Sequence, residues 1–356
     1  MPEFIYDAPW QRIVFGTGSV RRQLRSEIER LGAERVLAVT SPARQRISAG
    51  LLCSLSDLIA DVFTGVRPHV PVVVAEMASD RARAARADAV LSIGGGSTTG
   101  TAKAIALDTG LPIIAVPTTY AGSEVTPVWG LTENGRKRTG SDPAALPRVV
   151  VYDPDLLGSM PESVAAASGF NALAHCVEAF WAPGRSASVA VIAEEGIHAL
   201  GAGLRTLADA RAEAAAPDLL YGAYLAGSAF ATAGSGLHHK LCHVLGGTYD
   251  LPHAQTHAVV LPYVLAFNAP GAPEAVDRIG RALNSANPVA ALRDLAKRLG
   301  IPLSLREIGL AETDLDEAAA LVAAVVPADN PVPADRAALR ALLAAAWSGT
   351  TTPEQS

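Results

Sequence analysis

The sequence is poor in cysteine, and its few cysteines show no pairing pattern. Cys53, Cys176 and Cys242 are an odd number without C-x-x-C spacing, which favours neither a disulfide framework nor a thiolate zinc site. The chain also lacks a run of about 18 uninterrupted apolar residues, the length that a membrane helix needs. Its first residues, MPEFIYDAPW, lack the basic start and apolar run of a secretory signal. We therefore expect a cytoplasmic protein with no membrane partner.

Positive charge is also scarce. The chain has only four lysines, and its formal net charge is -6. This balance removes the usual electrostatic basis for binding nucleic acid or anionic lipid. In contrast, 49% of the 356 residues are hydrophobic, which suffices for a large core and, at this length, for two domains.

The first half of the chain alternates short β-branched runs with helical patterns and with turns rich in glycine and proline. This order is typical of an α/β nucleotide-binding domain with a parallel sheet. The runs that we predict as buried strands are RVLAVT (35–40), ADVFTGV (60–66), AVLSIG (89–94), PIIAVP (112–117) and RVVVYD (148–153).

The second half has a different composition, because the β-branched runs stop after DPDLLGSMP. We therefore place a domain boundary near residue 158, with a Rossmann-like α/β domain at 1–158 and an all-α domain at 159–356. Only the tail 348–356 has the composition of a disordered segment. Ala/Leu-rich segments that predict helices lie at 187–208, 218–233 and 273–299.

A glycine-rich loop follows one of the predicted strands. In VLSIGGGSTTGTAKAIAL (90–107) an apolar run leads into Gly94, Gly95, Gly96 and Ser97, and then into a helix. Glycines let the backbone approach a phosphate closely, and the free N–H groups of a helix start complement its charge. The loop predicts a pyrophosphate site, although a tight strand-to-helix turn has the same composition.

A second loop, within VPTTYAGSEVTP (116–127), follows the next predicted strand and carries many hydroxyl groups. Ligands of open α/β sheets bind at the carboxyl edge, where both loops would lie. Serine and threonine are also ordinary loop residues, but two such loops after neighbouring strands favour a nucleotide. The hydroxyl side chains are those of Thr118, Thr119, Tyr120, Ser123 and Thr126.

Histidines gather in the second half. Asn171 and His175 are one helical turn apart and would share a helix face. Imidazoles suit both transition-metal ligation and proton donation, whereas a single histidine is more often a core or surface residue. Five of the eight histidines fall within GLHHKLCHVLGGTYDLPHAQTH (236–257), and they are His238, His239, His243, His253 and His257.

Four motifs resemble, in the same order, those of the iron-containing alcohol dehydrogenase superfamily. They are a GGGS loop, a PTTxxGSE-like loop, a helix like D-A-L-x-H and an H-x3-H-x9-H segment, and the resemblance covers roughly residues 10 to 270. It implies the fold shared with dehydroquinate synthase: a Rossmann-like N-terminal domain, a helical C-terminal domain, and a cleft for nicotinamide and substrate between them.

Two positions depart from the superfamily pattern, and they indicate one branch of the superfamily. Gly100 and Asn171 stand where metal-dependent members have aspartates. With the residues around them, they resemble the maleylacetate reductase branch of the superfamily. This resemblance implies NADH- or NADPH-dependent reduction of the carbon–carbon double bond of maleylacetate to 3-oxoadipate, a step in the catabolism of aromatic compounds.

The missing charge at Asn171 motivates a hypothesis about metal. Hydride transfer to an isolated ketone benefits from a Lewis acid, whereas hydride addition to a double bond conjugated with a ketone spreads charge over an enolate that hydrogen-bond donors stabilise. We therefore expect a metal-independent reductase in which Asn171, His175, His239 and His253 occupy the ancestral ligand positions.

The resemblance also implies roles for individual residues. The predicted catalytic residues are His243, as candidate proton donor, and His253, His239 and His175. The predicted substrate contacts are Lys240, Tyr120, Asn171 and Arg138, since a dicarboxylate needs cationic and polar anchors. The predicted cofactor contacts are Gly94, Gly95, Gly96, Ser97, Thr98, Thr118, Thr119, Ser123 and Thr126.

The sequence gives less information about the preference between NADH and NADPH and about the oligomeric state. VTSPARQR (39–46) has no acidic residue for a ribose 2′-OH, whereas Arg44 and Arg46 could meet a 2′-phosphate. Related reductases favour NADH, so we expect NADH with tolerance of NADPH. They are also usually homodimers, and the strand RIVFG (12–16) could pair across a two-fold axis.

Other functions stay open on the sequence alone. A related NAD(P)H-dependent reductase acting on another enone or keto acid would carry the same motifs. A lyase of the dehydroquinate synthase type would keep a zinc site and many basic residues, and a binding protein without catalysis would not need the histidine segment.

Overall fold

The computed structural model describes residues 10–42, 45–133, 136–158 and 160–350. The chain forms two compact units, one comprising Ala8–Ser159 and the other beginning at Met160. The α/β class of the first unit and the helical class of the second are confirmed. Part of the tail predicted as disordered, residues 351–356, lies outside the described residues, as does Arg44.

The N-terminal unit is built on a six-stranded sheet in the order β1-β8-β5-β4-β2-β3, in which all neighbouring strands are parallel. The five predicted strands are present. A sixth, β1, pairs with β8 at the sheet edge, with Val14 opposite Val151. The strands are β1 (Arg12–Phe15), β2 (Val36–Thr40), β3 (Ile59–Phe63), β4 (Ala89–Gly94), β5 (Ile113–Pro117) and β8 (Val149–Tyr152).

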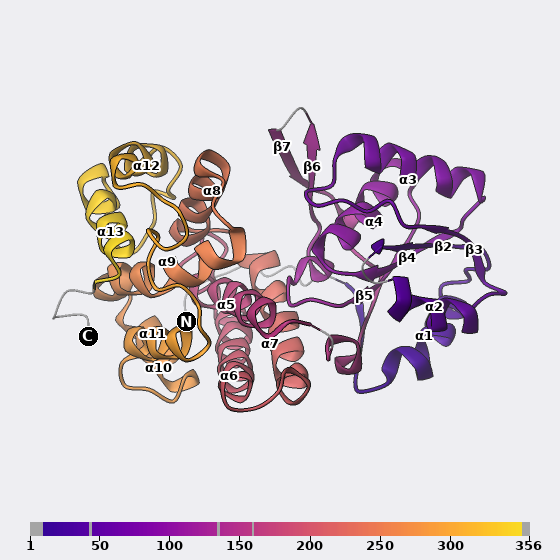
Figure 1. Ribbon diagram of the computed structural model, residues 1–356, viewed down its shortest axis with the longest axis horizontal. Helices are drawn as coiled ribbons and strands as arrows, with labels where there is room; N and C mark the ends of the chain where they lie inside the picture. The colour runs from indigo at the N-terminus through magenta and orange to yellow at the C-terminus, as the bar shows by residue number, and fades with distance from the viewer. Residues whose placement is uncertain (1–9, 43–44, 134–135, 159, 351–356) are drawn as a thin grey trace. The chain divides into compact units, whose positions relative to one another are not determined.

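Helices cover both faces of this sheet, which explains why its strands read as continuous apolar runs. The side chains of one strand alternate between the faces: in β4, Leu91 packs with Leu24 on one face, and Val90 packs with Ile105 on the other. Figure 1 shows α1 and α2 on one face and α3 and α4 on the other. The helices are α1 (Ser19–Arg30), α2 (Gln45–Ser54), α3 (Val72–Ala84) and α4 (Gly96–Thr109).

An antiparallel hairpin of β6 (Val128–Glu133) and β7 (Arg136–Ser141) follows the hydroxyl loop and was absent from the strand predictions. Its start is anchored by Lys103, which is 1% exposed and lies on α4. The ammonium group of Lys103 donates to the carbonyl oxygens of Thr126 at 2.8 Å and of Val128 at 2.6 Å. Burial lowers the pKa of Lys103 to about 7.

The second unit is helical throughout its described elements. The expected helix over 273–299 is wrong as a single element, because the chain breaks at Asn284, whose φ is 54°. The expected helix at 218–233 begins earlier and continues through Pro217. The longer helices are α5 (Glu162–Glu178), α6 (Ala187–Asp209), α7 (Ala212–Ala233), α8 (Leu237–Tyr249), α9 (His253–Asn268), α10 (Pro273–Ala282), α11 (Pro288–Arg298), α12 (Leu315–Ala323) and α13 (Arg336–Ser348).

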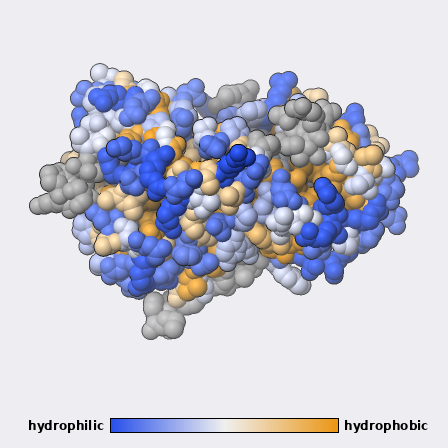
Figure 2. Space-filling view, turned by 60° about the horizontal axis from the view of Figure 1, so that its bottom comes forward, coloured by the Kyte–Doolittle hydropathy of each residue, from blue (hydrophilic) through white to orange (hydrophobic). Residues whose placement is uncertain are grey.

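Helix α6 is long and apolar enough to cross a membrane, and it is the one such helix in the described part of the chain. Within its most apolar window 56% is buried inside the protein, as expected for a helix that packs in a core. On the face drawn in Figure 2, hydrophobic residues form separate areas between hydrophilic ones.

Candidate active site

The glycine loop lies where β4 passes into α4. Its two first glycines approach neighbouring side chains so closely that a Cβ would clash: at Gly94 it would lie 2.3 Å from Thr98 Oγ1, and at Gly95 2.7 Å from Thr119 Cγ2. No side chain caps the start of α4, so its first N–H groups are available to an anion. The local geometry suits a pyrophosphate, and the binding role of this loop stays a prediction.

The hydroxyl loop lies beside the glycine loop. The Thr118 N–H donates to the Gly94 carbonyl at 3.0 Å, which joins the ends of β4 and β5. The hydroxyls of Thr118 and Ser123 are buried and have no hydrogen-bond partner among the described residues, as expected of groups that await a ligand. Thr126 is already engaged, because its hydroxyl accepts from Lys103 Nζ at 3.2 Å.

Replacing Gly95 with alanine tests the cofactor role of this loop. The added methyl group would collide with Thr119, so the loop must open, and we expect the dissociation constant of NADH to rise by roughly 10-fold or more. Fluorescence titration of NADH measures it. Gly50→Ala is the matched control, since Gly50 has nothing within 4 Å of its added Cβ. Equal NADH affinity for Gly95→Ala and wild type would remove this loop from the cofactor site.

Two predicted substrate contacts lie in the N-terminal unit. Tyr120 is 1% exposed, and burial raises the pKa of its phenol, so it stays a neutral hydrogen-bond donor. Arg138 on β7 has a 70% exposed side chain and lies 3.5 Å from the carboxylate of Glu133. The substrate role of both residues remains a prediction.

The histidines come together on three helices of the second unit. Helix α5 carries Asn171 and His175, α8 carries His238, His239 and His243, and α9 carries His253 and His257. The rings of His175 and His239 stack with centroids 4.9 Å apart. Phe230 of α7 closes this group, with its centroid 4.7 Å from that of His175.

His243 and His253 form the exposed side of the cluster. Their rings are nearly parallel, with centroids 6.4 Å apart and an interplanar angle of 15°. His253 also meets the buried ring of His257 at 4.5 Å. Of the predicted catalytic residues, these two have exposed side chains, whereas His239 is buried and His175 is half-buried.

The buried imidazoles are neutral at physiological pH. Burial lowers the pKa of His175 and of His239 well below the usual value, and the neighbouring imidazoles lower both further. The pKa of His238 falls to about 3 for the same reason. A neutral imidazole carries one N–H and one lone pair, so the hydrogen bond at one nitrogen decides the role of the other.

Two of these histidines, His238 and His257, form a buried pair to which the sequence assigned no role. His238 Nε2 and His257 Nδ1 share a hydrogen bond of 2.9 Å, and Cys242 Sγ lies 3.7 Å from the same His238 nitrogen. Within the described residues, these three are the one set of possible metal ligands whose atoms lie within 4.8 Å of one another. Their atoms already bond to each other.

The ancestral metal-ligand positions lack the negative charge of an aspartate ligand. Asn171 is a neutral amide, so the donor set with His175, His239 and His253 holds no charge to balance a divalent cation. The three histidines also do not form a set within 4.8 Å of one another. The oxygen of Asn171 and the Nε2 atom of His239 are nevertheless buried and have no hydrogen-bond partner among the described residues, as expected of groups that bind a ligand.

Glu178 is a residue of this site that sequence reasoning missed. It is 1% exposed, and it bonds to His239 Nδ1 and to the backbone at the start of α8. Its position three residues after His175, on one helix face, was the available signal.

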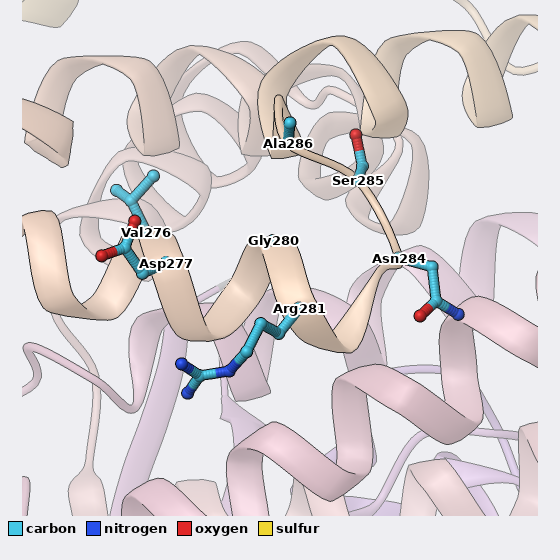
Figure 3. Close-up of a pocket in the computed structure, with 7 residues that line it drawn as sticks. All are labelled: Val276, Asp277, Gly280, Arg281, Asn284, Ser285 and Ala286. Carbon is cyan, nitrogen blue, oxygen red and sulfur yellow. The ribbon is translucent and has the colours of Figure 1, made fainter.

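A surface hollow of about 700 Å³ lies elsewhere, beside α10. Figure 3 shows Arg281 extending away from Ser285 and Ala286, and Arg281 Nη2 pairs with Glu194 at 3.2 Å. None of the histidines of the cluster lines it. The lining residues are Val276, Asp277, Gly280, Arg281, Asn284, Ser285 and Ala286.

Comparison with known proteins places the chain in a family. The profile for iron-containing alcohol dehydrogenases matches residues 10–154, and the profile for the C-terminal part of the Fe-containing alcohol dehydrogenase family matches residues 165–347. Together they span both units. Because members of this family are NAD(P)-dependent oxidoreductases, the protein is one as well.

Individual relatives extend over nearly the whole chain, and they bear out the resemblance to maleylacetate reductases. The maleylacetate reductase of Sphingobium indicum is 46% identical over 348 residues, which are 98% of this chain and 98% of that protein. Maleylacetate reductase 1 of Rhodococcus opacus is 44% identical over 353 residues, covering 99% and 98%. The crystal structure of maleylacetate reductase from Agrobacterium tumefaciens has a TM-score of 0.95 at 42% identity and covers 99% of this chain and 100% of that one. The chain therefore belongs to the iron-containing alcohol dehydrogenase family.

Proposed function

We propose that the protein reduces the carbon–carbon double bond of maleylacetate to 3-oxoadipate with NADH. The observation that carries this proposal is the neutral Asn171 on α5, one helical turn before His175, whose ring stacks on that of His239. An alcohol dehydrogenase would hold a cation at these positions. The relatives named maleylacetate reductase, at 42 to 46% identity over nearly their whole length, support it.

The reaction needs only a hydride from NADH and one proton. A hydride from NADH adds to the alkene carbon β to the ketone, and the alkene electron pair moves to the carbonyl oxygen to give an enolate. A proton then adds to the α carbon, so the substrate gains two hydrogens and NAD+ leaves. The enolate is stabilised by hydrogen-bond donors rather than by a Lewis acid.

The exposed histidines supply the proton in this scheme. His243 is the candidate donor, and His253 lies parallel to it at 6.4 Å. In the N-terminal unit, the glycine loop and the hydroxyls of Thr118 and Ser123 hold the cofactor. The enzyme acts without a metal, prefers NADH while accepting NADPH, works in the cytoplasm and forms a homodimer.

A direct assay tests the proposal. Freshly generated maleylacetate is added to enzyme and NADH, and the loss of NADH absorbance in the near ultraviolet is followed. Rapid loss with 3-oxoadipate as product supports the proposal. No loss with maleylacetate, but turnover of another enone or keto acid, would replace it by the alternative reductase.

Lys240 is the proposed anchor for a substrate carboxylate, since it is half-buried and adjacent to His239 on α8. Replacing it with methionine removes one charge-assisted contact, and we expect the KM for maleylacetate to rise by roughly 10-fold or more, with the KM for NADH nearly unchanged. Lys297→Met, at an exposed lysine of α11, is the matched control. An unchanged KM for maleylacetate would remove Lys240 from the substrate site.

A further inference from the structure

Glu178 is a carboxylate buried at the end of α5, and no described lysine or arginine pairs with it. Its Oε1 atom accepts the backbone N–H of His238 at 2.5 Å and that of His239 at 3.3 Å. Its Oε2 atom bonds to Nδ1 of His239. One carboxylate from α5 therefore holds both the first turn of α8 and the ring of a predicted catalytic histidine.

The start of α8 is shaped to receive this carboxylate. Gly236, the residue before the helix, offers no side-chain cap, so the first N–H groups need an acceptor from elsewhere. A Cβ at Gly236 would lie 3.0 Å from Oε1 and 3.1 Å from Cδ of Glu178. The glycine leaves room for Glu178, and the positive end of the helix dipole favours an anion there.

The backbone fixes the role of one carboxylate oxygen. Backbone N–H groups only donate, so Oε1 must accept. Burial raises the pKa of Glu178, and the backbone N–H groups oppose that rise. Two backbone N–H groups and the positive end of the α8 dipole converge on this carboxylate. They favour its ionised form, which accepts from Nδ1–H of His239.

We infer that Glu178 is a positioning residue that holds the proton of neutral His239 on Nδ1 and leaves Nε2 as a bare lone pair. His239 Nε2 is buried and has no partner among the described residues. In this form His239 accepts a hydrogen bond and cannot protonate the enolate from Nε2. The predicted catalytic residue His239 is therefore a hydrogen-bond acceptor at Nε2. The proton comes from His243 or His253, and this last step alone rests on the proposed function.

Replacing Glu178 with glutamine keeps the size of the side chain but reverses the direction of its hydrogen bond with His239. The glutamine oxygen must face the backbone N–H groups of α8, because those cannot change roles. Its NH2 group then faces Nδ1 of His239, which must give up its proton and become the acceptor. The neutral ring consequently carries its proton on Nε2.

Nitrogen-15 NMR of histidine-labelled protein reads this directly, because protonated and bare ring nitrogens resonate far apart. We expect His239 to be protonated at Nδ1 in the wild type and at Nε2 in Glu178→Gln, with the resonance assigned from its loss in His239→Gln. A wild-type His239 protonated at Nε2, or an unchanged spectrum in Glu178→Gln, would overturn the inference. If Glu178→Gln does not fold, the wild-type spectrum alone decides, because a His239 ring protonated at Nε2 would already overturn the inference.

Kinetics separate positioning from mere stability. Glu178→Gln should lower kcat for maleylacetate by roughly 10- to 100-fold while the KM for NADH stays within about 2-fold of the wild type. Glu27→Gln, at another buried glutamate that pairs with Arg12, should change neither kcat nor the His239 signal. An unchanged kcat in Glu178→Gln would contradict the catalytic consequence. The NMR experiment needs no substrate, so it stands even if maleylacetate is not reduced.

Discussion

Replacing His243 with asparagine is expected to lower kcat for maleylacetate by roughly 100- to 10,000-fold, the range that a general acid contributes. His243 is exposed on α8, whereas His175 and His239 are held neutral because burial lowers their pKa values. Asparagine keeps a polar side chain of similar reach but cannot transfer a proton. Steady-state kinetics with saturating NADH measures the loss.

A matched histidine outside the cluster provides the control for this experiment. His198 is exposed on α6 of the same unit, and His198→Asn should leave kcat unchanged. If His243→Asn keeps its kcat while His253→Asn loses it, the proton comes from His253. Full activity in both variants would contradict proton donation by the exposed imidazoles.

Replacing Asn171 with aspartate is expected to restore metal binding. The carboxylate would stand on α5 one turn before His175 and would add the charge that the present donor set lacks. A unit charge shifts a neighbouring titration by about 1–3 pKa units, so we expect affinity for a doubly charged cation to rise by roughly 100-fold or more. Equilibrium titration with zinc or ferrous ion measures the change.

The same substitution should impair catalysis in the absence of metal, because the new anion repels both the enolate and the substrate carboxylates. Asn284→Asp adds an equal charge on an exposed loop away from the cluster and should alter neither metal affinity nor kcat. Equal metal affinity for Asn171→Asp and wild type would show that the residue at 171 does not control metal binding.

Much of the fold could be predicted because burial on both faces leaves a strong signal. Strands β4 and β5 are buried at every position, and their residues are apolar apart from Ser92. The hairpin of β6 and β7 gave no such signal, since its second strand reads RKRTGS. The break between α10 and α11 depends on the left-handed conformation of Asn284, which the Ala/Leu-rich pattern around it does not reveal.

The site was predicted in part, and the difference has a physical cause. Residues close in sequence, such as His239 and His243, are placed by helix periodicity alone. Glu178 meets His239 across 61 positions of the chain, and Phe230 reaches His175 from another helix. Such partners are brought together by packing, which local patterns do not contain.

Turnover without a metal is the central part of the proposed function. The most direct test measures maleylacetate reduction by wild-type enzyme after exhaustive chelation, with bound metals quantified in the same sample. We predict full turnover at a metal content far below one per chain. A tightly bound, stoichiometric cation whose removal abolishes turnover, and whose return restores it, would contradict the claim.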